Sequence, residues 1–311
     1  MSDPDVLLVL GLSWSERQAA LRVSAPPTGA VHRLPLLGCR LGFTTVAPGP
    51  YCTGWHDLDP VHGGWRPCRA QRLATTSGQC ADCALLDQFR FVHQGHLGGY
   101  VPAALEHVLT APHRLYLATF ADGFTKVGTS VEHRRTARID EQGAVIADYV
   151  AAAVDGRLVR EAEDLVTAEL DVPQHRRRAA KVAALAHPAP RARVVERHAE
   201  TVAQVAALLD RAGFGPGLVP LQERWAPPAA MGALAAEPPS GSWLDYPHDL
   251  RVGAHGLDVE ACAGPAVLAR TGPDVGAGTL RYLVDLGRLT GARIVLGDVT
   301  SPEAEVQETL F

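Results

Sequence analysis

Residues 115–130 read LYLATFADGFTKVGTS, and this stretch decides how the chain is interpreted. Two runs of β-prone residues, 115–120 and 124–129, flank an Asp-Gly pair at 122–123. Asp and Gly tolerate the positive φ of a type I′ turn, so the pattern predicts a β-hairpin. Because side chains on a strand alternate faces with a period of two, we expect Lys126 on the second strand to lie across from Tyr116 on the first.

The elements that follow the hairpin extend it into an α+β unit. Residues 131–140 predict a helix, residues 144–154 a strand, and residues 156–170 a second helix. The first helix carries Arg134 and Arg138, which share a face because they are four residues apart. The fold class predicted is α+β, with a small antiparallel sheet flanked by helices.

The order of these residues resembles the core of the GIY-YIG nucleases. Leu115-Tyr116-Leu117 stands where that family has Gly-Ile-Tyr, and Lys126-Val127-Gly128 stands where it has Tyr-Ile-Gly. The run Arg-Ile-Asp-Glu-Gln-Gly-Ala at 138–144 is similar to a signature of one branch, a bacterial and archaeal family of unknown function with a cysteine cluster ahead of its core. The resemblance covers roughly residues 50–185, and the order of the motifs carries it.

The resemblance implies a site. In the family the first tyrosine activates water, an arginine on the next helix binds phosphate, and a helix glutamate holds one divalent ion, Mg²⁺ or Mn²⁺. The positions that match are Tyr116, Arg134 or Arg138, and Glu163. Lys126 replaces the family's second tyrosine, where an ammonium would hold a phosphate or lower the pKa of a phenol. Gly128 would allow close backbone approach. The family's later asparagine is absent here, and Gln174 is the nearest amide.

A cysteine pattern precedes the hairpin. Four of the six cysteines, Cys52, Cys68, Cys80 and Cys83, fall within 32 residues with the spacing C-x15-C-x11-C-x2-C. Such a set predicts a structural zinc site, because four protein ligands leave no position open for water. The alternatives are a redox-active Cys-x-x-Cys pair and four unrelated thiols. His56 and His62 lie between the first two cysteines and could replace one of them as a ligand.

The charge distribution is uneven. The chain has a formal charge of −5, yet residues 171–198 carry seven basic side chains and two acidic ones. This basic stretch includes Arg176, Arg177 and Lys181, which we interpret as candidate contacts to an anionic substrate such as nucleic acid. The alternative is an ordinary solvated helix face. The chain has two lysines, Lys126 and Lys181, and both fall within these candidate sites.

Composition indicates a globular protein, because 47% of the residues are hydrophobic and 20% are charged. No stretch predicts a membrane span or a signal peptide, so we expect a cytoplasmic protein. The predicted division is an N-terminal β region (1–50), a zinc module (51–100), a GIY-YIG-like core (113–212), a Pro-rich linker (213–248) and a C-terminal β region (249–311).

Three functions remain open at this point. The resemblance implies a divalent-metal-dependent phosphodiester hydrolase. The same fold without activity would serve as a module that binds nucleic acid or protein. A specialised-metabolism enzyme that uses the same residues on a small molecule is the third.

Overall fold

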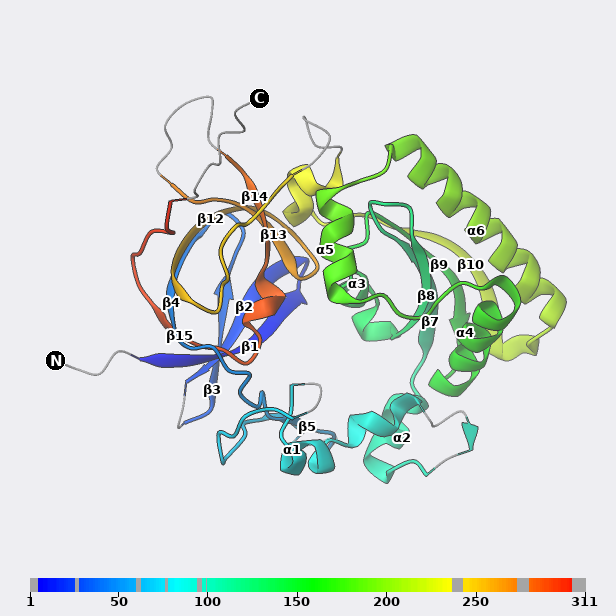
Figure 1. The fold of residues 1–311 in the computed structure, drawn as a ribbon. Coiled ribbons are helices and arrows are strands. Elements are labelled where there is room, and N and C mark those ends of the chain that lie inside the picture. The colour runs from blue at the N-terminus through cyan, green and yellow to red at the C-terminus, as the bar shows by residue number, and fades with distance from the viewer. Residues whose placement is uncertain are drawn as a thin grey trace.

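The computed structural model describes residues 5–25, 28–59, 63–75, 78–93, 97–98, 100–236, 243–272 and 280–303. The chain is a mixed α+β protein, as predicted. A nine-stranded sheet and a four-stranded sheet lie side by side, and a small cysteine-rich module lies below both in the view of Figure 1.

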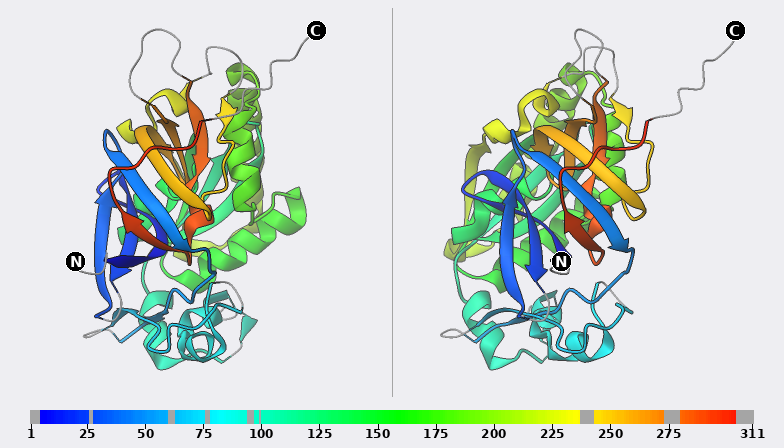
Figure 2. Two further views of the ribbon diagram at one scale, coloured as in Figure 1. Left: turned by 60° about the vertical axis from the view of Figure 1, so that its left-hand side comes forward. Right: turned by 90° about the vertical axis from the view of Figure 1, so that its left-hand side faces the viewer.

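The nine-stranded sheet joins the two ends of the chain. Its order is β11-β14-β13-β12-β4-β15-β1-β2-β3, and it curls strongly, as Figure 2 shows. Its strands are β1 (Val6–Ser15), β2 (Gln18–Ala25), β3 (Ala30–Pro35), β4 (Arg40–Ala47), β11 (Leu244–Asp245), β12 (Gly253–Ala263), β13 (Ala266–Arg270), β14 (Tyr282–Asp285) and β15 (Arg293–Leu296). The N- and C-terminal β regions therefore form one sheet, which we call the curled sheet.

Burial explains why the two ends combine. Alternate residues of β2, Leu21 and Val23, are wholly buried beside Phe43 of β4 and Leu257 of β12. The core that encloses these side chains draws on strands from both ends of the chain. The sequence also predicts single strands at residues 33–45 and 249–253, and both predictions are wrong in detail. Residues 33–45 form two strands because a turn with Gly38 at φ 70° interrupts them, and residues 249–252 are not a strand.

The four-stranded sheet, here the core sheet, has the order β10-β9-β7-β8. Its strands are β7 (His113–Thr119), β8 (Thr125–Val131), β9 (Ile146–Ala153) and β10 (Leu218–Trp225), and the helices around it are α3 (Arg135–Asp140), α4 (Gly156–Leu170), α5 (Arg178–Ala186) and α6 (Arg191–Ala212). α4 and α6 pack on one face (Figure 1), where Leu117, Val159 and Val205 share a core. The other face, which carries Tyr116, packs against outward-facing residues of β12–β14 such as Ala263 and Leu268.

The hairpin is present, but its register differs from the prediction. Tyr116 pairs with Gly128, and Lys126 pairs with Ala118. The connection spans residues 120–124, because the Phe120 backbone N–H donates to the Phe124 carbonyl at 2.9 Å. Within the turn only Gly123 takes a positive φ, 85°. The loop is therefore longer than the two-residue type I′ turn, and the strand pairing moves by two residues.

The predicted Pro-rich linker is structured along much of its length. β10 joins the edge of the core sheet, and the 3-10 helix Ala229–Ala235 buries Met231 and Leu234. Pro220 misled the prediction, because proline lacks the N–H that a central strand needs. An edge strand tolerates it, and the pairing of β10 with β9 is irregular between Pro220 and Glu223. Residues 237–242, which include the Pro238-Pro239 pair, lie outside the described residues.

The cysteine module contains little regular structure. It has the two-stranded sheet β5 (Trp55–Asp57) and β6 (Gly64–Arg66), the helix α1 (Ala81–Leu86) and the 3-10 helix Gln88–His93, and α2 (Ala103–Leu109) links it to the core sheet. Its largest buried cluster is formed by the four cysteines themselves, with Trp55 packed beside them. Across the described ranges, no helix combines the length and apolarity that a membrane crossing requires.

Candidate functional site

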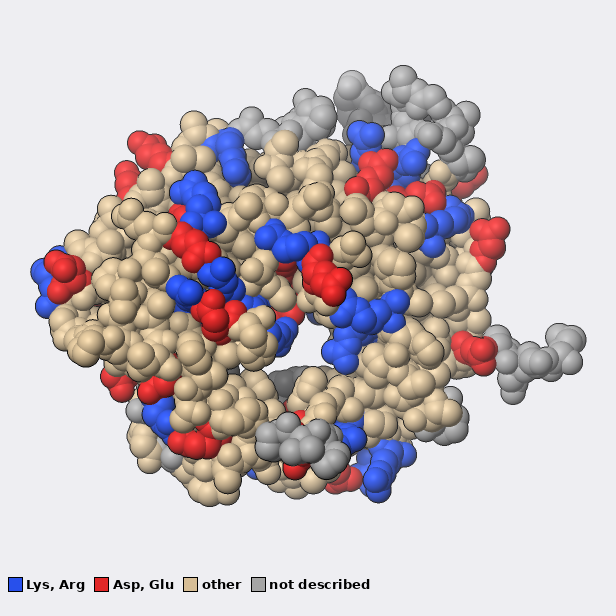
Figure 3. Space-filling view, turned by 180° about the vertical axis from the view of Figure 1, so that it is seen from behind, with Lys and Arg blue, Asp and Glu red and all other residues tan. Residues whose placement is uncertain are grey.

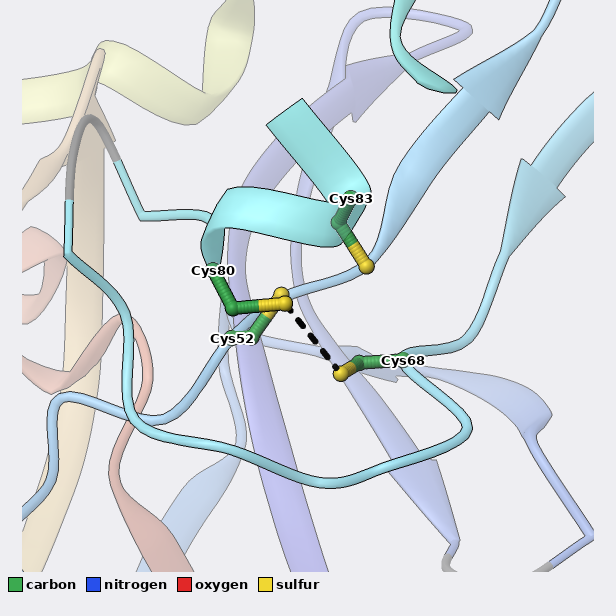
Figure 4. A group of neighbouring side chains, drawn as sticks. All are labelled: Cys52, Cys68, Cys80 and Cys83. Atoms are coloured by element: carbon green, nitrogen blue, oxygen red, sulfur yellow. Dashed lines mark hydrogen bonds between the residues drawn. The ribbon is translucent and has the colours of Figure 1, made fainter. Parts of the chain in front are cut away.

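The four predicted cysteine ligands converge. Cys80 and Cys83 project from the first turn of α1, while Cys52 and Cys68 reach the same point from two loops (Figure 4). All four sulfur atoms lie within 4.8 Å of one another, and all four residues are buried. The Sγ atoms of Cys68 and Cys80 are 3.8 Å apart, the separation expected at the corners of a tetrahedron with metal–sulfur bonds of about 2.3 Å. The cluster can therefore hold a metal ion.

The environment of the thiols supports a metal. Burial raises the pKa of the Cys52 and Cys83 thiols, so thiolates there need a nearby positive charge. Two turns organise the cluster: the Gly54 N–H lies 3.4 Å from the Cys52 sulfur, and the Gln71 N–H donates to the Cys68 carbonyl at 3.1 Å. His56, an alternative ligand from the sequence, does not belong to the cluster, and His62 lies outside the described residues.

Tyr116 occupies the second candidate site. Its side chain is wholly buried, and no group in the described residues meets full hydrogen-bond geometry with its hydroxyl, although Arg138 approaches closely enough to interact with it. A Cβ added at Gly128 would lie 2.5 Å from the Tyr116 Cζ and hydroxyl oxygen atoms. The glycine predicted to admit a substrate therefore makes room for the tyrosine ring. Burial, opposed by the Arg138 charge, raises the pKa of Tyr116 to about 12.

The sequence has two lysines, and one of them lies close to this tyrosine while the other interacts with the first. The Lys126 Nζ atom is 5.7 Å from the centre of the Tyr116 ring and donates to the Gln174 carbonyl at 2.9 Å. The Lys181 Nζ atom donates to Gln142 Oε1 at 2.7 Å. Burial lowers the pKa of each lysine to about 8, and the charge of Arg138 lowers both further. The positive charge of Lys126 also lowers the pKa of Lys181.

Glu163, which lies on α4, also interacts electrostatically with Tyr116 and Lys126. Its carboxylate is 8% exposed, and its ion pair with Arg160 is 3.7 Å long. Burial raises the Glu163 pKa, while the charges of Arg160, Lys126 and Arg138 lower it. The Glu163 charge raises the pKa of both Tyr116 and Lys126, so the three groups lie close enough to influence one another electrostatically; we call this buried group the Tyr116 compartment.

The two candidate arginines behave differently. Both reach Glu141: Arg134 Nη2 lies 2.7 Å from one carboxylate oxygen and Arg138 Nη1 lies 4.0 Å from the other. Arg138 belongs to the Tyr116 compartment, because its positive charge lowers the pKa of Tyr116. Arg134 instead lies near Arg22 of the curled sheet. Arg134 ends a 3-10 turn, Glu132–Arg134, rather than lying within α3.

The 138–144 signature has a structural explanation. Asp140 accepts a hydrogen bond from Trp225 Nε1 at 2.9 Å and pairs with Arg17 of the β1–β2 turn at 3.2 Å. Gly143, at φ 71°, lies against the backbone of residues 263–264. The segment thus joins the core sheet to the curled sheet. Burial raises the pKa of Asp140 to about 6, and the Arg17 charge opposes this shift.

The basic stretch 171–198 is not one continuous surface. Arg176 forms a two-bonded ion pair with Asp122 and stacks on Phe120 and Phe124, with its guanidinium carbon 4.7 and 4.4 Å from the ring centres. Its side chain is 8% exposed. Arg176 therefore stabilises the hairpin loop and is poorly placed as a substrate contact. Arg177 is exposed at the start of α5.

A buried polar chain was not foreseen from the sequence. Thr119 Oγ1 lies 2.7 Å from His198 Nδ1, and His198 Nε2 lies 2.7 Å from Asp148 Oδ2. Arg224 donates twice to Asp148, at 3.0 and 3.1 Å. Thr119 and His198 are 0% and 1% exposed, and the chain ties α6 to the core sheet. No motif predicts it, because its members come from four separate elements.

Comparison with known proteins adds no assignment: no family model, no curated protein and no solved structure matches this chain.

Proposed function

We propose that this chain is a phosphodiester hydrolase of the GIY-YIG type that acts on nucleic acid and carries a structural zinc ion. The observation that supports the proposal is the shared compartment of Tyr116, Lys126, Arg138 and Glu163, which come from β7, β8, α3 and α4. The carboxylates Glu163 and Glu141 act on this group together with the cations Lys126, Arg138, Arg160 and Lys181, so cations are in excess and an anion such as a phosphate group is favoured.

Zinc fits the cysteine cluster because four thiolates at tetrahedral spacing are its usual structural ligands. It would also supply the order that the module lacks elsewhere, since the cysteines form its largest core.

Mg²⁺ or Mn²⁺ fits Glu163. Carboxylate oxygens are the ligands these ions prefer, and the single ion pair of Glu163 within the described ranges is too long to be a hydrogen bond. When bound, the ion would polarise the phosphate and stabilise the leaving oxygen. Arg138, with a side chain 47% exposed at the edge of the compartment, is placed to receive a phosphate oxygen.

Proton transfer suits Lys126 better than Tyr116. A general base works best when its pKa is near the working pH, and the pKa of Lys126 is about 8 whereas that of Tyr116 is about 12. In this proposal Lys126 accepts a proton from the attacking water. Tyr116 keeps its proton and uses its hydroxyl to orient that water.

A catalytically inactive nucleic-acid-binding module is the second candidate, because the Tyr116 hydroxyl is buried between the two sheets. A cleavage screen with labelled DNA and RNA, with and without Mg²⁺ or Mn²⁺, separates the two. For a hydrolase, Glu163→Ala abolishes cleavage and Lys126→Arg removes it while retaining the positive charge. Binding without metal-dependent cleavage by the wild-type protein would favour the second candidate.

A further inference from the structure

Two arginines of the curled sheet stand opposite each other on neighbouring strands. Arg22 of β2 and Arg33 of β3 are directly paired across the two strands. Like charges in such a pair repel each other, and they destabilise a sheet. Within the part of the chain that the structure describes, neither guanidinium makes a hydrogen bond or an ion pair. Arg22 is half-buried and Arg33 is exposed.

The position of Arg22 is informative. Leu21 and Val23 point into the curled sheet, so Arg22 lies on its outer face with Ser24. Ser24 lines a pocket together with Cys52 and Cys68 of the cysteine module. At the other end of β2, the β1–β2 turn contacts α3 through Arg17 and Asp140. Arg22 therefore lies where the curled sheet, the cysteine module and the core sheet meet.

Further cations lead from this point to the Tyr116 compartment. The positive charges of Arg33 and Arg134 both lower the pKa of Arg22. The charge of Arg22 in turn lowers the pKa of His56 in the cysteine module. Arg134 shares Glu141 with Arg138, which belongs to the compartment. We call Arg33, Arg22, Arg134 and Arg138 the cation row. Glu141 is the carboxylate that pairs with the row in the described residues.

The molecular surface agrees with this arrangement. Figure 3 shows an opening between the cysteine module and the two sheets, and Lys and Arg side chains border it. The overall charge of −5 makes such a local excess of positive charge more distinctive. Several cations beside one opening suit a polymer that carries one negative charge per unit, which is the pattern of a nucleic-acid backbone.

We propose that the cation row binds the phosphate backbone of a nucleic-acid strand and directs it between the cysteine module and the curled sheet toward the Tyr116 compartment. The strand neutralises the Arg22–Arg33 pair, which explains why the fold retains two repelling arginines. Binding of the strand by the cation row does not depend on the proposed function. Only the delivery of the strand to the Tyr116 compartment rests on it.

The test is binding of a labelled single-stranded oligonucleotide of about 16 nucleotides, followed by fluorescence anisotropy with full-length protein and no divalent ion. Arg22→Gln with Arg33→Gln should weaken binding at least tenfold. It should also reduce the slope of log affinity against log salt by about 1.4, or about 0.7 for each phosphate that the variant no longer neutralises. The control is Arg211→Gln, which removes an exposed arginine of α6 outside both the cation row and the basic stretch and should leave both values unchanged.

Thermal unfolding without oligonucleotide verifies the fold, since removal of a repelling charge should not lower stability. An unchanged affinity in the Arg22/Arg33 variant, or an equal loss in the α6 control, would overturn the cation row. Loss of binding in a protein that never cleaves would support the row and refute the hydrolase. Cleavage by a protein whose binding does not depend on Arg22 and Arg33 would support the hydrolase and refute the cation row.

Discussion

Lys126 provides a quantitative test of the electrostatics of the Tyr116 compartment. Burial lowers its pKa from 10.5 to about 8 in the folded protein. Between these two pH values the unfolded chain holds a proton that the folded chain has released, so the free energy of unfolding rises with pH. Each pKa unit is about 1.4 kcal/mol, and the full rise from Lys126 is therefore about 3 kcal/mol. Below pH 8 the charged, buried ammonium lowers stability by that amount.

The substitution that checks this is Lys126→Met, which keeps much of the side-chain volume and removes the charge. At pH 7 the variant should be more stable than the wild type by about 2 kcal/mol, because the lost hydrogen bond to the Gln174 carbonyl offsets about 1 kcal/mol. Urea unfolding followed by tryptophan fluorescence between pH 7 and 10.5 measures both proteins. The advantage of the variant should vanish at about pH 9.5, and near pH 10.5 the variant should be less stable by up to about 1 kcal/mol, the contribution of the lost hydrogen bond. If both proteins show the same pH dependence, the ammonium is solvated and the compartment is more open than described.

Three further predictions concern other parts of the structure. Metal analysis should find one zinc per chain, and chelation should unfold the cysteine module; folded protein with four freely titratable thiols would contradict the site. Gly128→Ala should lower the free energy of unfolding by about 1–3 kcal/mol, because the added methyl group overlaps the buried Tyr116 ring. An unchanged free energy of unfolding would mean that the ring can move. Arg176→Gln should lower stability and leave oligonucleotide affinity unchanged, since Arg176 is committed to Asp122; a loss of affinity at retained stability would restore the basic stretch as a contact surface.

The local elements of this protein could be predicted from the sequence. The helix Gly156–Leu170 has the bounds expected, and its start is explained by Asp155, whose side chain accepts from the N–H groups of Arg157 and Leu158. The cysteine spacing also predicted a cluster that the structure brings together. Both signals are local, because capping and ligand spacing depend on a few neighbouring residues.

The arrangement in space depended on contacts between distant residues. That strands from both ends of the chain share one sheet follows from pairs such as Leu7 with Ile294, which no periodicity encodes. The polarity of Arg176 suggested a ligand contact, yet an aspartate 54 residues away neutralises it. Arg22 and Arg33 attracted no notice in the sequence, because each is an ordinary strand arginine until its neighbours are known. The sequence alone determined which residues can form helices, strands and a metal cluster, whereas only the tertiary structure decided which charges are paired and which remain available to a partner. The physical reason is that the energy of a charge depends on burial and on neighbours supplied by the whole fold.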